Sequence, residues 1–276
     1  MILSLSEIST IGATFREDLR AYAAAGFDGI GIWEMKLGED DAGDLEAFRA
    51  SGLRATNCVP AVPSILPNGV IEGPEDVKER VEEICASMHR FAAFAPDSVL
   101  CLTGPAGDRE EQEARELVID GLRRIAAAAD TAGVRLGLEP IHASQRDALS
   151  LVTTIPQTLE LLHEAGLPDV GLMVDLWHLW DSPAIERHLA EHVGRITGVH
   201  VADWFPGERG DRALPGEGSS RTVELVRVLR DAGWSGALDV EIFGDPDSPD
   251  SLWALEVEEA ARRAREAVAA VAAGKS

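Results

Sequence analysis

The sequence predicts an α/β protein, a (β/α)8 TIM barrel that forms a single domain over residues 1–276. Short apolar, β-branched runs alternate with longer amphipathic runs rich in Ala, Glu and Arg, and each kind occurs eight times. The length of 276 residues suits eight such units, because this barrel typically takes about 250 residues and a doubly wound sheet usually has fewer strands. No linker or low-complexity segment divides the chain, so we predict one domain.

The apolar runs are predicted to be the strands. Each is short, and one amphipathic run separates it from the next, which is the order of a parallel sheet with helical crossovers. The eight predicted strands are Ile2–Ser6, Gly29–Trp33, Arg54–Val59, Ser98–Leu102, Arg135–Glu139, Val170–Asp175, Ile196–Val201 and Ala237–Ile242.

The amphipathic runs are predicted to be the helices. Glycine follows the last periodic residue in the segments AAAGFDG, ASGLRA, TAGVRL, EAGLPD and DAGWSG, and glycine at this place typically ends a helix. This repeated turn into an apolar run marks one structural unit. The eight predicted helices are Phe15–Ala25, Asp44–Ser51, Glu75–Phe94, Arg109–Ala132, Pro156–Ala165, Pro183–His192, Thr222–Ala232 and Leu252–Ala272.

The charge balance argues against several classes of partner. Lys and Arg number 25 against 48 Asp and Glu, which gives a formal net charge of −23. Nucleic-acid phosphates and anionic membrane surfaces would be repelled by this mean field, so neither partner is expected. No apolar run approaches the roughly 18 residues of a membrane span, and no signal peptide is predicted. The three cysteines lack a CxxC motif and suggest neither a disulfide framework nor a thiolate zinc site, which favours a cytoplasmic location.

Metal-capable side chains occur on four successive predicted strands. The segments are RLGLEP with Glu139, GLMVD with Asp175, GVHVAD with His200 and ALDVEIF with Glu241. The carboxyl ends of barrel strands carry the chemistry. One such group commonly has an ion-pair or capping explanation, but four are costly to bury unless a cation binds them. Three carboxylates and one imidazole favour one divalent ion, Mn²⁺ first, with Mg²⁺, Co²⁺ or Zn²⁺ as alternatives.

The chain resembles the sugar phosphate isomerase/epimerase superfamily, which has the xylose-isomerase-like barrel and includes ketose epimerases, inosose dehydratases and endonuclease-IV-like proteins. The resemblance spans nearly the whole chain. The segments that carry it are LGLEPIH at 136–142, GLMVDLWHLW at 171–180, GVHVADW at 198–204, DRALPGEG at 211–218 and LDVEIF at 238–243. It implies that Glu139, Asp175, His200 and Glu241 hold the metal.

The resemblance also implies substrate contacts. His178, three residues after Asp175, matches a family histidine that contacts substrate oxygens, and a surface or capping histidine is the alternative. Arg212 matches an arginine that binds a substrate hydroxyl or carboxylate. The alternative is a loop salt bridge from this arginine to Asp211 or Glu217.

Three further residues are candidates for the substrate site. His142 is either a substrate contact or a partner of a metal ligand. Glu34 and Trp33 end the second predicted strand, where the carboxylate could reach the substrate and the ring could cover sugar carbons. The alternatives are a rim carboxylate and ordinary packing of the tryptophan.

The predicted enzyme is a metal-dependent isomerase or epimerase. A divalent ion that bridges a keto oxygen and the neighbouring hydroxyl acidifies the adjacent C–H. Glu139 and Glu241 would then remove and return a proton through a metal-stabilised enediolate. The expected substrate is a ketose or related keto-polyol. The expected partner is therefore a small sugar or cyclitol, and a homo-oligomer is left open.

Two alternative functions stay open. A metal-dependent dehydratase or lyase acting on a keto-cyclitol, of the inosose or dehydroshikimate type, would use the same ligands, with His142 or His178 as the leaving-group acid. The other alternative is a non-catalytic barrel, which would retain the fold and bind a sugar without catalysing a reaction. The endonuclease-IV branch is not favoured, because Ala213 replaces its loop histidine, and Asn57 and Thr103 stand where its other metal-binding histidines are expected. The net charge of −23 argues the same way.

Overall fold

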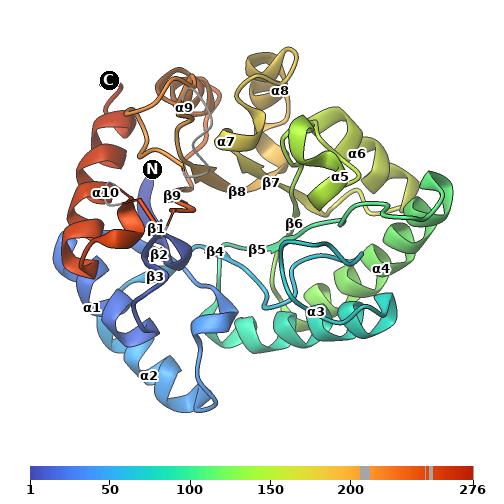
Figure 1. The fold of residues 1–276 in the computed structure, drawn as a ribbon, viewed down its shortest axis with the longest axis horizontal. Helices are drawn as coiled ribbons and strands as arrows, with labels where there is room; N and C mark the ends of the chain where they lie inside the picture. Colours follow the sequence, from blue (N-terminus) through green and yellow to red (C-terminus); the bar gives the residue numbers. More distant parts are fainter. Residues whose placement is uncertain (206–211, 246, 249–250, 276) are drawn as a thin grey trace.

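The computed structural model describes residues 1–205, 212–245, 247–248 and 251–275 (Figure 1). In this part of the chain, nine strands make one sheet in the order β3-β2-β1-β9-β8-β7-β6-β5-β4. Every pairing within it is parallel. The strands are β1 (Ile2–Ser6), β2 (Gly29–Gly31), β3 (Arg54–Ala55), β4 (Asn57–Cys58), β5 (Ser98–Cys101), β6 (Leu136–Leu138), β7 (Gly171–Asp175), β8 (Ile196–Val201) and β9 (Ala237–Val240).

The two ends of this order are halves of one strand. Only Thr56 separates β3 from β4, and its backbone N–H donates to the Ile30 carbonyl at 2.9 Å. β3 pairs with β2 and β4 pairs with β5, so the sheet closes on itself. The described strands therefore occupy the eight positions of a barrel, and the predicted (β/α)8 fold is confirmed.

The helices form an outer layer around the sheet (Figure 1). The main ones are α1 (Phe15–Ala25), α2 (Asp41–Ser51), α3 (Val77–Phe91), α4 (Glu111–Ala132), α6 (Ile155–Glu164), α8 (Ile185–Glu191), α9 (Thr222–Asp231) and α10 (Val257–Ala272). Two single-turn helices, α5 (Arg146–Leu149) and α7 (Leu176–Leu179), follow β6 and β7. None of the helices in the described part of the chain is both long and apolar enough to cross a membrane.

Several helices begin a few residues away from their predicted starts, and a local side-chain cap accounts for the start of α2. α2 begins at Asp41 instead of Asp44, because the Asp40 carboxylate accepts the Gly43 N–H at 3.0 Å. The last predicted helix begins late. Its first residues, Leu252–Ala254, form a separate 3-10 turn capped by Ser251, and α10 starts at Val257. Caps use single side chains, whereas the apolar period that predicts a helix extends over several turns.

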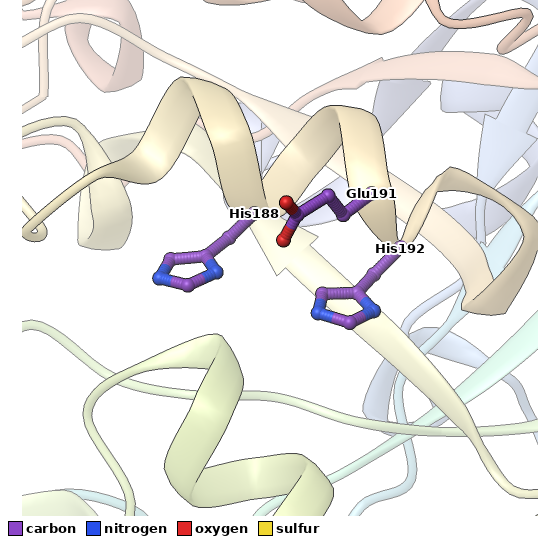
Figure 2. A group of neighbouring side chains, drawn as sticks. All are labelled: His188, Glu191 and His192. Atoms are coloured by element: carbon purple, nitrogen blue, oxygen red, sulfur yellow. The ribbon is translucent and has the colours of Figure 1, made fainter.

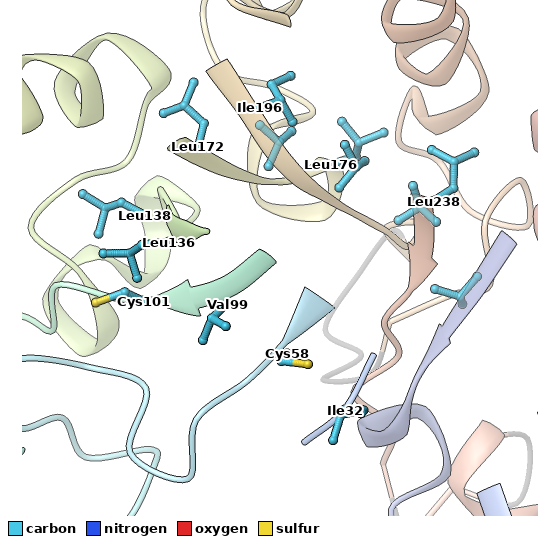
Figure 3. Close-up of a cluster of buried hydrophobic side chains, with 14 of the residues drawn as sticks. Ile32, Cys58, Val99, Cys101, Leu136, Leu138, Leu172, Leu176, Ile196 and Leu238 are labelled. Atoms are coloured by element: carbon cyan, nitrogen blue, oxygen red, sulfur yellow. The ribbon is translucent and has the colours of Figure 1, made fainter. Parts of the chain in front are cut away.

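The main apolar core lies between the sheet and the helices. Figure 3 shows strand side chains of this layer, in which alternate residues such as Val99 and Cys101 project from the strands into one cluster. A second, smaller apolar cluster lies at the carboxyl ends of the strands. Its buried members are Ile8, Trp33, Val59, Leu100, Leu102, Ile141 and Met173. This second cluster borders the site described below.

Polar side chains occupy much of the barrel interior. Ser4 Oγ lies 2.7 Å from Thr56 Oγ1, and Ser98 Oγ donates to Thr197 Oγ1 at 2.9 Å. Both bonds join strands that are not neighbours, so they cross the interior. Gly31 leaves room for a further polar group, since a Cβ there would lie 2.3 Å from Asp239 Oδ2. The interior thus carries acid groups as well as hydroxyls.

Candidate metal and substrate site

Three of the four predicted metal ligands converge at the carboxyl ends of adjacent strands. Glu139 follows β6, Asp175 ends β7 and His200 lies in β8. One potential ligand atom from each lies within 4.8 Å of the others, and all three side chains are buried. The parallel register brings about this convergence, because Asp175 pairs directly with His200.

Glu241, the fourth predicted ligand, lies beside this group after β9. Its Oε2 is 3.6 Å from His200 Nδ1, and Glu139 Oε1 is 3.4 Å from the same nitrogen. The two glutamates therefore approach one edge of the imidazole from β9 and β6, which are separated in the sheet by β7 and β8. The carboxylates of Glu139 and Glu241 thus reach the same ring nitrogen of His200 from two strands that are not neighbours.

Arg212 lies inside the acidic cluster. Its Nη1 donates to Asp175 Oδ2 at 2.7 Å and to Glu241 Oε2 at 3.1 Å. The guanidinium is held between the rings of Trp177 and Phe243, with its central carbon 4.6 and 4.7 Å from their centroids. The side chain is thus fixed, and it is buried rather than extended into a loop. Asp211, the salt-bridge partner considered from the sequence, lies outside the described residues.

His178 is held as a neutral ring. Its Nδ1 accepts the backbone N–H of His142 at 3.2 Å, which leaves the ring proton on Nε2. That Nε2 lies 3.6 Å from Asp175 Oδ2, which can accept its proton, and 3.4 Å from Arg212 Nη2, which cannot. Burial, with a smaller contribution from Arg212, lowers the pKa of His178 to about 3 against the attraction of Asp175. The neutral ring can therefore donate one hydrogen bond into the site at pH 7.

Burial and the neighbouring charges shift the pKa values of Glu139 and His200 upward. Burial raises the pKa of Glu139 to about 7, although His200 opposes the shift. Burial disfavours the charged form of His200, but the carboxylates of Glu241, Glu139 and Asp239 together raise its pKa to about 10. Protons and a cation would therefore compete for the same atoms, because imidazole and carboxylate bind metals in their deprotonated forms.

The donor set fits a divalent cation. Glu139 Oε1 and both ring nitrogens of His200 are buried without a hydrogen-bond partner among the described residues. Buried polar atoms in this state are costly, and a cation bound by Glu139 Oε1 and His200 Nδ1 would satisfy these two atoms. Oxygen donors outnumber the single nitrogen donor, which suits a hard or borderline ion.

Asp239 is a further residue of the site that the sequence analysis did not single out. It lies on β9, is fully buried, and its Oδ2 is 3.8 Å from His200 Nε2. Neither of its oxygens has a hydrogen-bond partner in the described part of the chain, and burial raises its pKa to about 7. The alternation of strand side chains could have revealed it, because residues two apart, such as Asp239 and Glu241, face the same way.

A cavity of about 240 Å³ opens beside these groups. Its polar lining residues are Glu139, His178, Arg212, Glu241 and Gln145. Its other lining residues are largely apolar and include Trp33, Val59, Ile71, Leu100, Leu102 and Leu149. The cavity can therefore hold a small molecule whose oxygen atoms meet the polar lining residues and whose carbon atoms meet the apolar ones.

The structure separates two of the sequence candidates from this cavity. The Glu34 carboxylate accepts the Ala61 N–H at 2.9 Å and the Ser87 hydroxyl at 2.6 Å, and it pairs with Arg90 at 3.5 Å. The His142 ring instead lies at the rim, where its Nδ1 is 2.7 Å from Ser144 Oγ. Neither residue lines the cavity. The partners that hold Glu34 come from distant segments, so the sequence pattern around it carried no sign of them.

Three comparisons with known proteins bear on this site. A family model described as xylose isomerase-like TIM barrel matches residues 19–270. The chain is 26% identical over 258 residues to a 3-dehydroshikimate dehydratase of Pseudomonas aeruginosa, a match that covers 88% of this chain and 38% of that protein. It is 26% identical over 136 residues to a D-psicose 3-epimerase of Enterocloster bolteae, covering 49% of this chain and 42% of the other. The matches thus span less than half the length of both relatives.

The solved structures agree with the fold. A crystal structure of the IOLI protein with a bound zinc atom superposes with a TM-score of 0.80 at 21% identity, over 99% of this chain and 98% of that one. At this identity the likeness concerns the fold. It extends over almost the whole of both chains, strands and outer helices alike.

Proposed function

Because the chain belongs to the xylose isomerase-like TIM barrel family, we propose that it is a divalent-metal-dependent isomerase or epimerase acting on a ketose or related keto-polyol. The observation that carries the proposal is the convergence of Glu139, Asp175 and His200 within 4.8 Å, with Glu241 beside them at one end of a small cavity. The epimerase among its relatives supports the same reaction class.

Glu139, Asp175, His200 and Glu241 are the residues that would hold the ion, with Mn²⁺ as the first candidate. When bound, such an ion polarises a substrate carbonyl and acidifies the neighbouring C–H. Arg212 keeps the carboxylates of Asp175 and Glu241 in place through its two hydrogen bonds. This pairing reduces the repulsion between the acid groups before any cation arrives.

Glu139 and Glu241 are the proposed acid and base. One carboxylate removes the proton from the carbon next to the carbonyl, and the other returns a proton to the opposite face or to the neighbouring carbon. In the protein without the ion, burial raises the pKa of Glu139 to about 7, so this carboxyl group can take up or release a proton near neutral pH. Arg212 and the Nε2–H of His178 are placed to bind substrate oxygens at the same end of the cavity.

A dehydratase acting on a keto-cyclitol is the second candidate. The match to the 3-dehydroshikimate dehydratase covers 88% of this chain, and the apolar lining residues of the cavity suit a carbocyclic ring. In this reaction a carboxylate removes the proton next to the carbonyl, and the β-hydroxyl leaves as water. The proton taken up by that carboxylate can pass to the leaving hydroxyl, while the neutral Nε2–H of His178 would hydrogen-bond the departing oxygen and keep its own proton.

Proton exchange in D₂O tests both candidates. The wild type, the Glu241→Gln variant and the surface control Glu258→Gln are analysed for metal and incubated with ketoses and keto-cyclitols under NMR observation. We expect metal-dependent deuterium incorporation next to the carbonyl in the wild type and the control. Loss of an acid or base group should slow this exchange in Glu241→Gln by about 100-fold or more.

The product then separates the candidates. An epimer or an isomer supports the first function, whereas an unsaturated product and released water support the dehydratase. A wild-type protein that binds no divalent ion and exchanges no proton with any compound would overturn both and favour a sugar-binding barrel without catalysis.

A further inference from the structure

The segment His188-Leu-Ala-Glu191-His192 places three metal-capable side chains at the end of α8. The two histidines are four residues apart and the glutamate is three residues after the first, so all three share one face of a helix. Histidines at this spacing on a helix bind one zinc ion in known metalloprotease motifs. The sequence therefore contains a second group of possible metal ligands. It is distinct from the site formed by Glu139, Asp175, His200 and Glu241, which is called the barrel centre below.

The geometry brings these three side chains together. One potential ligand atom from each of His188, Glu191 and His192 lies within 4.8 Å of the others. The two rings are nearly parallel, with an interplanar angle of 12° and centroids 6.2 Å apart. Figure 2 shows both rings projecting from the same side of the helix, with the Glu191 carboxylate close to them.

The three groups are available for a ligand. His188 Nδ1 is buried without a hydrogen-bond partner among the described residues, which is an unfavourable state for a polar atom. Glu191 is exposed and approaches Arg187 only at 4.0 Å, at the limit of an ion pair. Pairs of this kind at the surface contribute little, so Glu191 can turn to a cation at small cost.

Main-chain hydrogen bonds hold the backbone of the two histidines at helical spacing. The His192 N–H donates to the His188 carbonyl at 3.1 Å, and the His188 N–H donates to the Ala184 carbonyl at 3.1 Å. The helix is short, and Ala184 at its start has a φ of 55° and no side-chain cap. A cation bridging its last turn would therefore stabilise a helix that begins without a side-chain cap.

We propose that His188, Glu191 and His192 form a second cation site, on the outer surface of the barrel, for Zn²⁺ or another transition ion that favours nitrogen ligands. Two imidazoles and one carboxylate match Zn²⁺, Ni²⁺ and Cu²⁺, whereas the oxygen-rich barrel centre suits harder ions. The net charge of −23 draws cations to the molecule as a whole.

This second site is separate from the barrel centre. His192 lies just before the 3-10 turn Val193–Arg195, which leads into the first residue of β8. It is thus at the end of the barrel where the strands begin, whereas Glu139 and Glu241 lie where strands end. The proposal does not depend on the reaction catalysed at the other end.

Zinc titration of matched double variants tests the site. Metal-stripped wild type, His188→Ala/His192→Ala and the control His89→Ala/His163→Ala are titrated with Zn²⁺ by calorimetry. The control removes two exposed histidines from α3 and α6, and so it corrects for general histidine binding. We expect the α8 variant to bind one equivalent of Zn²⁺ less than both the wild type and the control, with its catalytic activity unchanged.

Two further readouts sharpen the test. Zn²⁺ should slow amide hydrogen exchange in residues 185–195 of the wild type and not in the α8 variant. Glu191→Gln should lower the affinity for this one Zn²⁺ ion by about tenfold, because the substitution removes an anionic ligand. Equal zinc stoichiometry in the wild type and the α8 variant would overturn the site. Unchanged affinity in Glu191→Gln would overturn the assignment of the carboxylate as third ligand.

Discussion

At the scale of single residues, we propose that Asp239 positions the imidazole of His200. Its Oδ2 faces His200 Nε2 at 3.8 Å, while Glu139 and Glu241 approach the other ring nitrogen. Histidine ligands of metals commonly direct their second nitrogen to a carboxylate, which orients the ring and increases its basicity. Gly31 leaves the space that the Asp239 carboxylate needs.

Asp239→Asn keeps the shape of this side chain and removes its charge. We expect the affinity of the barrel centre for Mn²⁺ to fall by about 10- to 100-fold, because His200 loses its orienting carboxylate. Calorimetric titration with Mn²⁺ measures the effect, and the exposed Asp130→Asn is the matched control. Equal Mn²⁺ affinity in Asp239→Asn and the wild type would contradict the positioning role.

At the scale of one element, α1 shows how a local motif sets a boundary. Thr14 N–H donates to Glu17 Oε2 at 2.8 Å, and the Glu17 N–H donates to Thr14 Oγ1 at 3.4 Å. This capping box satisfies donors that the first turn of a helix leaves free. α1 begins at Phe15 and ends at Ala25, as the amphipathic pattern predicts, and the next residue, Gly26, has a φ of 82°.

Thr14→Ala removes the cap without touching the core. We expect the free energy of unfolding to fall by about 1 kcal/mol, the usual effect of losing a threonine cap. Urea denaturation measures it. Thr131→Ala serves as control, because Thr131 lies inside α4, bonds only the Ala127 carbonyl, and alanine favours a helix interior. An equal or larger loss in the control would show that the cap is not the cause.

At the scale of the whole molecule, barrel closure joins the two ends of the chain. β1 pairs with β2 on one side and with β9 on the other, and α10 packs against α1. Closure buries groups that are then sensitive to pH, among them Cys58, Cys101 and Tyr22.

This burial makes stability depend on alkaline pH. Burial raises the pKa of Cys101 to about 12 and shifts those of Cys58 and Tyr22 well upward. Thiols of the unfolded chain ionise near pH 9. Above that pH the unfolded chain releases protons that the folded chain keeps, so the free energy of unfolding should fall as pH rises and stay unaffected by these groups below it.

Urea denaturation between about pH 8 and about pH 10.5 checks this dependence. Cys101→Ala should be less stable than the wild type at about pH 8 through its smaller volume, yet lose less stability on going to higher pH. Equal pH dependence in both proteins would show that the buried thiol does not contribute.

Much of the barrel was readable from the sequence because its signals are local. Apolar runs, amphipathic periods and terminal glycines each span a few residues, and they predicted the eight strand positions correctly. The convergence of Glu139, Asp175 and His200 followed from strand order, since parallel strands end at the same edge. The cap at Asp40 and the separate turn at Leu252–Ala254 were not foreseen, because single side chains decide them.

Only the tertiary structure decided which partners the polar groups take. Arg212 pairs with Asp175 and Glu241, and Glu34 turns to Ser87 and Arg90. These contacts join segments far apart in the chain, and their geometry depends on how the loops pack over the barrel. The sequence by itself therefore determined the fold and the kinds of side chain at the carboxyl ends of the strands. Their pairing depended on distances and burial, which arise only once the barrel has closed.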